Sequence, residues 1–318
     1  MPGLYTTKEL EVVEPPTDGK EGVGIFRFTD YYTVFFYGRM PDQIPGKGEA
    51  LARMAAHNFT MLEAAGVPTH FRRFIAPDKI EFSLVRQPER GATHTASATN
   101  RIVPLQVIAR NELPQGSSTH RRLAAGTLTP QDLGLDAAPV FGQRLDAPII
   151  EYAAMLESPK RFIHAPAAQK LAGLTDEQFR TIQQTTNTSN EVITRHAAAL
   201  GVSHCDCNFE YMISSRGRIV VADSPGTPDG SRFLVDGEHC GKQIMRNWYA
   251  AHGFEPPVQK WLTDGVPKSE WPVPGPLPAG LVPAMTDLYR SLTEAWTGRR
   301  IWNAPDLSTA MQAVQKIT

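Results

Sequence analysis

The sequence predicts an α+β fold. Segments that alternate like strands and segments with helical spacing are mixed along the chain, without the regular β-α alternation that builds a parallel sheet. Two pairs of short strand-like segments are joined by turn-forming residues, which is the pattern of antiparallel hairpins. One long helical segment precedes the second hairpin, and the carboxy-terminal end is helical again. No internal repeat is found.

The first hundred residues predict strands around one helix. Residues 4–13 are strand-like, and residues 24–37 are rich in β-branched and aromatic side chains. After a Pro-Gly break, apolar residues recur at helical spacing over residues 51–62. Two short strand-like segments, 71–75 and 80–85, then flank an Ala-Pro-Asp-Lys turn. We expect an antiparallel sheet with one helix in this part.

Residues 91–100 are small and polar, so we place there the boundary between two α+β subdomains, 1–100 and 101–250. In the second subdomain, Thr175 and Gln178 have the spacing of a capping box at the start of a long helix. Its other expected elements are a strand at 102–109, a hairpin at 209–222 and a helix at 242–251.

Residues 251–318 form a separate carboxy-terminal segment. Prolines are dense from 267 to 283, so this stretch is expected to be extended and to wrap the surface. A helix is expected at 281–296. The tail is also rich in tryptophan, at Trp261, Trp271, Trp296 and Trp302. We expect it to pack on the chain's own core, and an interface between copies in a homo-oligomer stays the alternative.

Composition excludes several classes of protein. The 318 residues are 41% hydrophobic and 20% charged, which is ordinary for a globular protein. The formal net charge of −1 gives no general attraction to nucleic acid or to a membrane surface. No apolar run approaches the ~20 residues of a membrane span, and the first residues lack the pattern of a signal peptide. We therefore expect a cytoplasmic protein that binds neither nucleic acid nor membrane.

The cysteines do not predict a disulfide framework. There are three, Cys205, Cys207 and Cys240, and two of them are almost adjacent. His204 beside the first pair suggests zinc, but Cys-x-Cys is not the usual spacing and no second cluster completes four ligands. Buried cysteines without a metal are the favoured interpretation.

Two constellations have the residues that bind phosphate. Residues 44–49, Ile-Pro-Gly-Lys-Gly-Glu, form a tight loop that leads into a helix, where Lys47 suits an anion. An ordinary turn with a solvated lysine is the alternative. Arg110 at a strand end, followed by Ser117 in a Gly-Ser-Ser turn, has the composition of a phosphate clamp. An ordinary basic loop is the alternative there.

Two further constellations lie in the second predicted hairpin and after it. Glu210 and Asp223 stand on neighbouring strands, and two carboxylates can hold Mg²⁺ together with several waters. Hydrated surface carboxylates are the alternative. Residues 226–232, Gly-Thr-Pro-Asp-Gly-Ser-Arg, form a rigid turn that presents Arg232. Loops that combine proline, glycine and charge often serve binding.

These segments occur together in one known family. From about residue 4 to residue 249 the chain is similar to SAICAR synthetase, phosphoribosylaminoimidazole-succinocarboxamide synthase. The motifs occur in the right order at the right separation, which makes the resemblance specific. The matching segments are Pro41-Asp42-Gln43-Ile44-Pro45-Gly46-Lys47-Gly48-Glu49, Ala65-Gly66-Val67-Pro68-Thr69-His70-Phe71, Pro104-Leu105-Gln106-Val107-Ile108-Ala109-Arg110-Asn111, Phe209-Glu210, Gly226-Thr227-Pro228-Asp229 with Ser231-Arg232, and Lys242-Gln243.

The resemblance implies a fold, a reaction and a set of ligands. It implies an amino-terminal antiparallel sheet, a second sheet-and-helix half and an ATP-grasp-like cleft. The family joins a carboxyaminoimidazole ribotide to aspartate with ATP and Mg²⁺. Matched residue by residue, the resemblance places Arg110, Ser117 and Arg232 on the ribotide 5′-phosphate, Lys8 on nucleotide phosphates, Glu210 and Asp223 on Mg²⁺, and Lys47, Asp229 and Lys242 among the loop contacts.

The chain also departs from the family's pattern, chiefly by losing charge. Losing one donor that stabilises a transition state typically lowers the rate ~10²–10³-fold. The ordinary reaction is therefore expected to be very slow, the catalytic residues stay unassigned, and the use of ATP is left open. The replaced positions are Thr7 (glycine in the family), Leu10 (a basic residue), Tyr31 (arginine), Phe36 (Asp or Asn), residues 153–155 (Ser-Thr-Lys), Asn208 (lysine) and Ser224 (glutamate), with Lys160 near the place of an acid.

We therefore expect an enzyme that binds a purine-related or imidazole ribotide and performs altered chemistry at the base ring. The resemblance favours specialised nucleoside biosynthesis of the coformycin and pentostatin type. A divergent but authentic SAICAR synthetase is the first alternative. A ribotide-binding pseudoenzyme is the second, because retained phosphate ligands and lost ATP ligands look the same in sequence.

Overall fold

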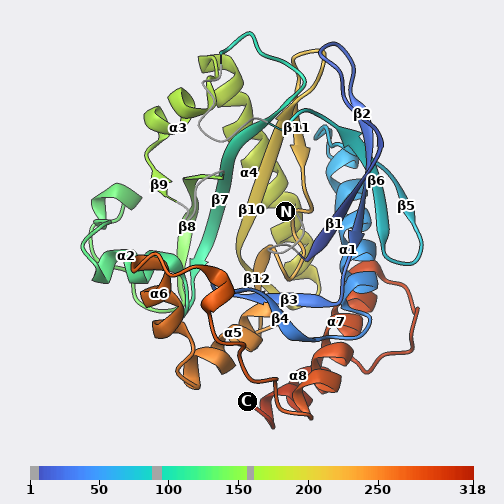
Figure 1. Ribbon diagram of the computed structural model, residues 1–318, viewed down its shortest axis with the longest axis vertical. Helices are drawn as coiled ribbons and strands as arrows, with labels where there is room; N and C mark the ends of the chain where they lie inside the picture. The colour runs from blue at the N-terminus through green and yellow to red at the C-terminus, as the bar shows by residue number, and fades with distance from the viewer. Residues whose placement is uncertain (1–6, 88–94, 156–160) are drawn as a thin grey trace.

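The α+β prediction is confirmed by the computed structural model, which describes residues 7–87, 95–155 and 161–318 (Figure 1). The amino-terminal part is a four-stranded antiparallel sheet in the order β1-β2-β6-β5. Its strands are β1 (Lys8–Glu14), β2 (Gly22–Phe28), β5 (Phe71–Ile75) and β6 (Lys79–Leu84). Helix α1 (Lys47–Ala64) packs against this sheet through the apolar face that its spacing predicts.

The expected strand over residues 24–37 is divided in the structure. Strand β2 (Gly22–Phe28) ends before Asp30, and the chain then forms a separate hairpin of β3 (Tyr31–Val34) and β4 (Gly38–Gln43). Composition did not show this break, because both segments are rich in aromatic and β-branched residues.

The second sheet has seven strands in the order β13-β12-β10-β7-β8-β9, with β11 pairing β10 beside this path. The hairpin expected at residues 209–222 is confirmed as β10 with β11. The strands are β7 (Arg101–Leu113), β8 (Gln143–Ala154), β9 (Phe162–Ile163), β10 (Ser203–Ile213), β11 (Ile219–Ala222), β12 (Ser231–Val235) and β13 (Glu238–His239).

One face of the second sheet is covered by α4 (Asp176–Ala199), which runs along β7 and β10 (Figure 1). Residues such as Phe209 and Tyr211 alternate onto this face and are fully buried. The Tyr211 hydroxyl lies 2.7 Å from the Thr186 hydroxyl of the helix. The predicted capping box is confirmed, because the backbone amide of Gln178 donates to the Thr175 hydroxyl at 3.1 Å. The opposite face of this sheet is therefore the one left for polar residues.

The remaining helices are short and follow the second sheet. The helix expected at residues 242–251 is confirmed as α5. The bounds are α2 (Ser118–Ala124), α3 (Ala165–Ala172), α5 (Lys242–Ala251) and α6 (Glu255–Thr263), with short 3₁₀ turns at Gln131–Leu133 and Lys268–Glu270. None of the helices in the described part of the chain combines the length and apolar character of a membrane span.

The carboxy-terminal tail packs on the chain's own core, as expected. Helix α7 (Leu281–Thr297) lies beside α1, and α8 (Leu307–Gln315) packs on α7 (Figure 1). Trp296 is buried, and its indole N–H donates to the Asn58 side chain of α1 at 2.7 Å. The homo-oligomer and the three-part division at residues 100 and 250 stay predictions. Residues 91–94 of the expected boundary segment, like residues 4–6 of the first expected strand, lie outside the described residues.

Candidate functional site

The second sheet carries a row of polar residues on the face opposite α4, which we call the polar face. Strand β10 places Asp206, Asn208 and Glu210 there as alternate residues. The neighbouring strand β7 pairs Arg110 with Asp206 and Gln106 with Glu210, and paired residues of an antiparallel sheet point to the same side. At about 3.4 Å per residue, Asp206 and Glu210 are roughly 14 Å apart along the strand. The polar face therefore has two separate ends.

The first end, which we call the arginine end, is built around Asp206. The Arg110 guanidinium donates to the Asp206 carboxylate at 3.0 Å, and the Arg232 guanidinium donates to it at 2.6 Å. Asp206 and Arg110 are both buried. Burial by itself would raise the pKa of Asp206, but the charges of Arg232 and Arg110 outweigh it and hold that pKa below its usual value. Asp206 therefore stays ionised and orients both guanidinium groups.

The three residues predicted for a ribotide phosphate come together at this end. Arg110 also reaches the hydroxyls of Ser117 and Ser118, at 3.5 and 3.0 Å. Arg232 donates to the carbonyl of Gly116 at 3.1 Å. Ser117 is fully buried and caps α2 through its hydroxyl. The Gly-Ser-Ser turn is thus held against the two arginines.

The arginine end has more hydrogen-bond donors than the protein itself satisfies. Among the described residues, the buried Nε atoms of Arg122, Arg232 and Arg246 have no hydrogen-bond partner. Burial lowers the pKa of Arg246 to about 10, and the positive charge of Arg232 adds to that effect. Arg122 pairs with Glu151, whose carboxylate also holds Arg110. An anion with several acceptor oxygens would satisfy such a group of donors.

The second end, which we call the lysine end, joins the two sheets. The Lys8 ammonium of β1 pairs with the Asp223 carboxylate and donates to the Ser224 hydroxyl at 2.9 Å. Glu210 lies opposite Ala222, the residue before Asp223, across the β10–β11 hairpin. Burial would raise the pKa of Asp223, but the charge of Lys8 outweighs it and keeps the carboxyl ionised. Lys8 and Asp223 therefore pair at this end, and Glu210 stands across the hairpin from the residue before Asp223.

The hard oxygen donors at this end suit Mg²⁺, which usually keeps several waters and takes only one or two protein carboxylates beside substrate phosphates. Glu210 and Asp223 can supply those two carboxylates.

No group of three or more His, Cys, Asp or Glu side chains with metal-site geometry exists among the described residues. All three cysteines are free and buried, as favoured, and burial raises the pKa of Cys207 and Cys240 to about 12.

The loop at residues 44–49 binds anions, but they are carboxylates of the chain itself. Asp30 accepts hydrogen bonds from the backbone amides of Gly46 and Gly48, at 3.1 and 2.9 Å. Lys47 is fully buried and donates to the Asp229 carboxylate at 3.0 Å. The alternative of a solvated lysine was therefore wrong. The sequence could not show which acidic residues reach the loop from elsewhere.

The residues predicted as loop contacts converge on Asp229. Burial would raise the pKa of this carboxyl, but Lys47 and then Lys242 outweigh it and hold the pKa well below its usual range. The Tyr289 hydroxyl of α7 donates to Asp229 at 2.7 Å. The 226–232 turn is thus anchored to α1, α5 and α7, and its last residue is Arg232, at the arginine end.

Three of the positions that depart from the family's pattern lie at the polar face. Ala153 of β8 is paired with Gln106, Asn208 is in the middle of β10, and Ser224 bonds Lys8. The replacements at Tyr31 and Phe36 belong to the β3–β4 hairpin and the turn within it. The remaining positions are placed as follows: Thr7 is buried before β1, Leu10 is exposed on β1, residues 154 and 155 follow Ala153, and Lys160 lies outside the described residues.

Sequence reasoning missed several residues of this site. Asp206 and Arg122 stand in segments that the sequence pointed to but were assigned no role of their own, and Glu151 and Arg246 were not named. The spacing of Arg246, one helical turn after Lys242 on a predicted helix, is the one signal that pointed to it.

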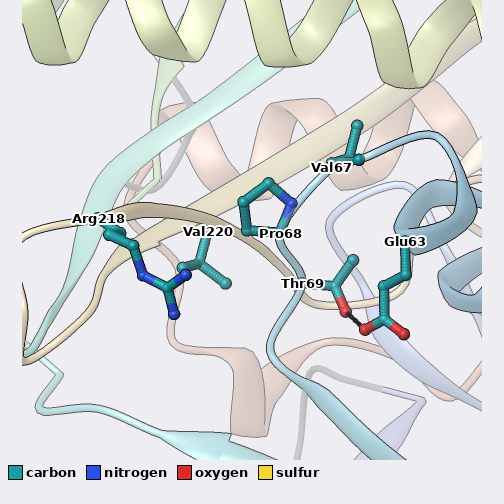
Figure 2. Close-up of a pocket in the computed structure, with 7 residues that line it drawn as sticks. Glu63, Val67, Pro68, Thr69, Arg218 and Val220 are labelled. Atoms are coloured by element: carbon teal, nitrogen blue, oxygen red, sulfur yellow. Dashed lines mark hydrogen bonds between the residues drawn. The ribbon is translucent and has the colours of Figure 1, made fainter.

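A separate pocket includes none of the residues predicted for the site (Figure 2). It is lined by Glu63, Gly66, Val67, Pro68, Thr69, Arg218 and Val220.

Buried histidines predict how stability depends on pH. His70, whose ring lies 3.2 Å from the Asp223 carbonyl, and His204 both have a pKa lowered to about 4 by burial. Histidine in an unfolded chain titrates near pH 6.5, so between about pH 6.5 and 4 the unfolded state binds more protons. We expect the free energy of unfolding to fall by roughly 2 kcal/mol per histidine from pH 7 to pH 5.

Urea unfolding at the two pH values measures this difference. In His70→Gln the difference in the free energy of unfolding between the two pH values should shrink by roughly 2 kcal/mol, the contribution of one histidine. His252→Gln, at an exposed position after α5, should leave the difference unchanged. An equal pH dependence in His70→Gln and the unaltered protein would contradict the prediction.

Comparison with known proteins identifies the scaffold. The family model described as SAICAR synthetase matches residues 17–259. A relative from Archaeoglobus fulgidus is 32% identical, with 99% of each chain covered. The structure of SAICAR synthase from Saccharomyces cerevisiae complexed with SAICAR superposes with a TM-score of 0.66, at 18% identity, over 94% of this chain and all (100%) of that one. A type-2 SAICAR synthetase in complex with ADP gives a TM-score of 0.64, at 20% identity, over 94% of this chain and 99% of that one. The two structures share the α+β fold, and the family model together with the full-length relative shows that this chain belongs to the SAICAR synthetase family.

Proposed function

We propose that this chain binds a ribotide along the polar face, with the 5′-phosphate at the arginine end, and performs altered chemistry at the base ring. The observation that carries the proposal is the Arg110–Asp206–Arg232 arrangement. It presents two oriented guanidinium groups beside serine hydroxyls, with buried Nε donors left over. A phosphate dianion has the charge and the acceptor oxygens that this group requires.

The lysine end has the residues for a second phosphate-bearing ligand with its metal. Glu210 and Asp223 would hold Mg²⁺, which supplies positive charge to phosphate oxygens when bound. Lys8 pairs with Asp223 in this structure and would turn its ammonium to the nucleotide phosphates, as the family resemblance implies. The family is a ligase family, so the chain is an enzyme by descent, and ATP is the nucleotide that the family uses.

The altered chemistry is inferred from charge that the polar face lacks. Ala153, Asn208 and Ser224 lie at or beside the path between the two ends and carry no charge. Each donor missing from a phosphoryl-transfer site typically costs ~10²–10³ in rate. We place the enzyme in specialised nucleoside biosynthesis of the coformycin and pentostatin type, where the base ring of a ribotide is remodelled.

An authentic SAICAR synthetase is the second candidate. Two observations favour it: the relative that is 32% identical over 99% of both chains, and the lysine end with Lys8, Glu210 and Asp223 in place. In that case the chain joins a carboxyaminoimidazole ribotide to aspartate with ATP. A ribotide-binding pseudoenzyme is the remaining outcome.

Aspartate-dependent phosphate release separates these candidates. With Mg-ATP, aspartate and carboxyaminoimidazole ribotide, we expect the chain to bind ribotide but to release phosphate at a negligible rate. A rate typical of an enzyme, roughly 1 s⁻¹ or more, would restore the authentic synthetase. Binding of ribotide without turnover of any ribotide supplied would instead indicate the pseudoenzyme.

A further inference from the structure

We propose that the middle of the polar face accepts an uncharged base ring, whose edge carries a carboxamide or a lactam group, and that Asn208 is the residue that recognises it. The inference rests on the proposed function, because it requires the ribotide phosphate at the arginine end. The inference goes beyond the proposed function by naming the substrate class: ribotides whose base bears an amide in place of a carboxylate.

The position of Asn208 is the first observation. On β10 it lies two residues from Asp206 and two residues from Glu210, on the same face as both. Each step of two residues is about 7 Å along the strand. A ribotide held by its phosphate at Arg232 and extended along β10 therefore passes Asn208 before it reaches the lysine end. Asn208 is partly buried, so its side chain borders this path.

The second observation is that the described neighbours of Asn208 on β7 and β8 carry no unpaired charge. Across the sheet its neighbour on β7 is Ile108, and Ala153 lies next along this face on β8. Glu151, opposite Ile108, already pairs with Arg110 and with a second arginine, Arg122. A base carboxylate placed here would leave its charge without a cation, which is costly in a partly buried site.

The third observation is the hydrogen-bonding capacity of the Asn208 side chain. Its amide makes no hydrogen bond to any other residue in the described part of the chain. An asparagine amide offers both a donor N–H and an acceptor C=O. A carboxamide or lactam edge has the complementary acceptor and donor, so two hydrogen bonds form side by side. A carboxylate only accepts, so it would face the amide oxygen without a proton between them.

The backbone holds Asn208 rigidly in this place. Strand β10 is central in the sheet, paired with β7 along one edge and with β12 and β11 along the other. The backbone N–H of Asn208 donates to the Gly230 carbonyl at 3.3 Å, which fixes this part of β10 to the turn that ends at Arg232. The side chain that recognises the base and the arginine that holds the phosphate thus share one framework, as selective binding requires.

Binding measured by calorimetry on the full chain tests this assignment with three probes. These are ribose 5-phosphate, 5-aminoimidazole-4-carboxamide ribotide and the matching 4-carboxylate ribotide. We expect the carboxamide to bind about tenfold more tightly than ribose 5-phosphate, since two hydrogen bonds together typically strengthen binding by about one decade. The carboxylate should bind no more tightly than ribose 5-phosphate.

Asn208→Lys should reverse the preference, so that the carboxylate gains about tenfold and the carboxamide loses as much. The matched control is Asn187→Lys, the same exchange at an exposed position of α4, which covers the opposite face of the sheet. It should leave the binding of all three probes unchanged. If the lysine variant does not fold, Asn208→Ala serves instead and should reduce the carboxamide to the affinity of ribose 5-phosphate.

The outcomes separate this inference from the proposed function. If ribose 5-phosphate and both ribotides fail to bind the unaltered chain, the proposed function fails and the inference fails with it. If they bind but the carboxylate is preferred, the phosphate site stands and the assignment of Asn208 is overturned. A carboxamide preference that survives in Asn208→Ala also overturns it.

Discussion

Arg232→Ala is expected to lower the affinity for ribose 5-phosphate and for ribotides roughly 30-fold to several thousand-fold. Truncating one partner of a buried, hydrogen-bonded charge pair costs about 2–5 kcal/mol, and each 1.4 kcal/mol is tenfold in affinity. Arg232 is suited to this test because its side chain is 18% exposed, against 2% for Arg110. Its removal leaves Asp206 paired with Arg110, so the fold should survive.

Calorimetric titration of ribose 5-phosphate measures the loss, and thermal unfolding checks that the variant is folded. Arg216→Ala is the matched control, because Arg216 is an exposed arginine in the turn between β10 and β11. It should bind as the unaltered chain does. A folded Arg232→Ala variant with unchanged affinity would remove the phosphate from the arginine end and so defeat the proposed function.

Lys47→Met is expected to lower the free energy of unfolding by about 3 kcal/mol or more, because breaking a buried ion pair leaves the partner's charge uncompensated. The Lys47 side chain is fully buried, and that of Asp229 is 9% exposed. Breaking a buried pair typically costs about 3–5 kcal/mol. Lys242 and the Tyr289 hydroxyl still interact with Asp229 in the variant, so we expect a loss near the lower of these values. Urea unfolding at neutral pH gives the value.

Lys260→Met is the control, since it removes a lysine from an exposed i,i+4 ion pair with Asp264, whose side chains are 74% and 44% exposed. Pairs of that kind contribute about 0.3–0.5 kcal/mol. Equal losses in the two variants would show that the Lys47–Asp229 pair has no special weight. Restoration of stability when Asp229→Leu is added to Lys47→Met would support the ion-pair explanation.

Predictions from local pattern were confirmed wherever neighbours in sequence are also neighbours in the structure. The capping box at Thr175 needs only residues three apart, and the β5–β6 and β10–β11 hairpins need only short turns. The division between β2 and β3 was missed because both segments have strand composition. Asp30, which lies after β2, is held by the amides of a loop 16 and 18 positions further on.

By itself, the sequence determined the α+β class and the family scaffold, and it predicted the residue types of the proposed phosphate site. These depend on short-range propensities and on motifs that keep their order along the chain. The tertiary structure decided which charges meet: Arg110 with Asp206, 96 positions away, and Lys47 with Asp229, 182 positions away. The loop at residues 44–49 therefore stabilises the fold through Lys47 and Asp229, as well as marking the family. Alternation along β10 puts Asp206, Asn208 and Glu210 on one face, but only the pairing with β7, which is distant in sequence, brings Arg110 and Gln106 beside them.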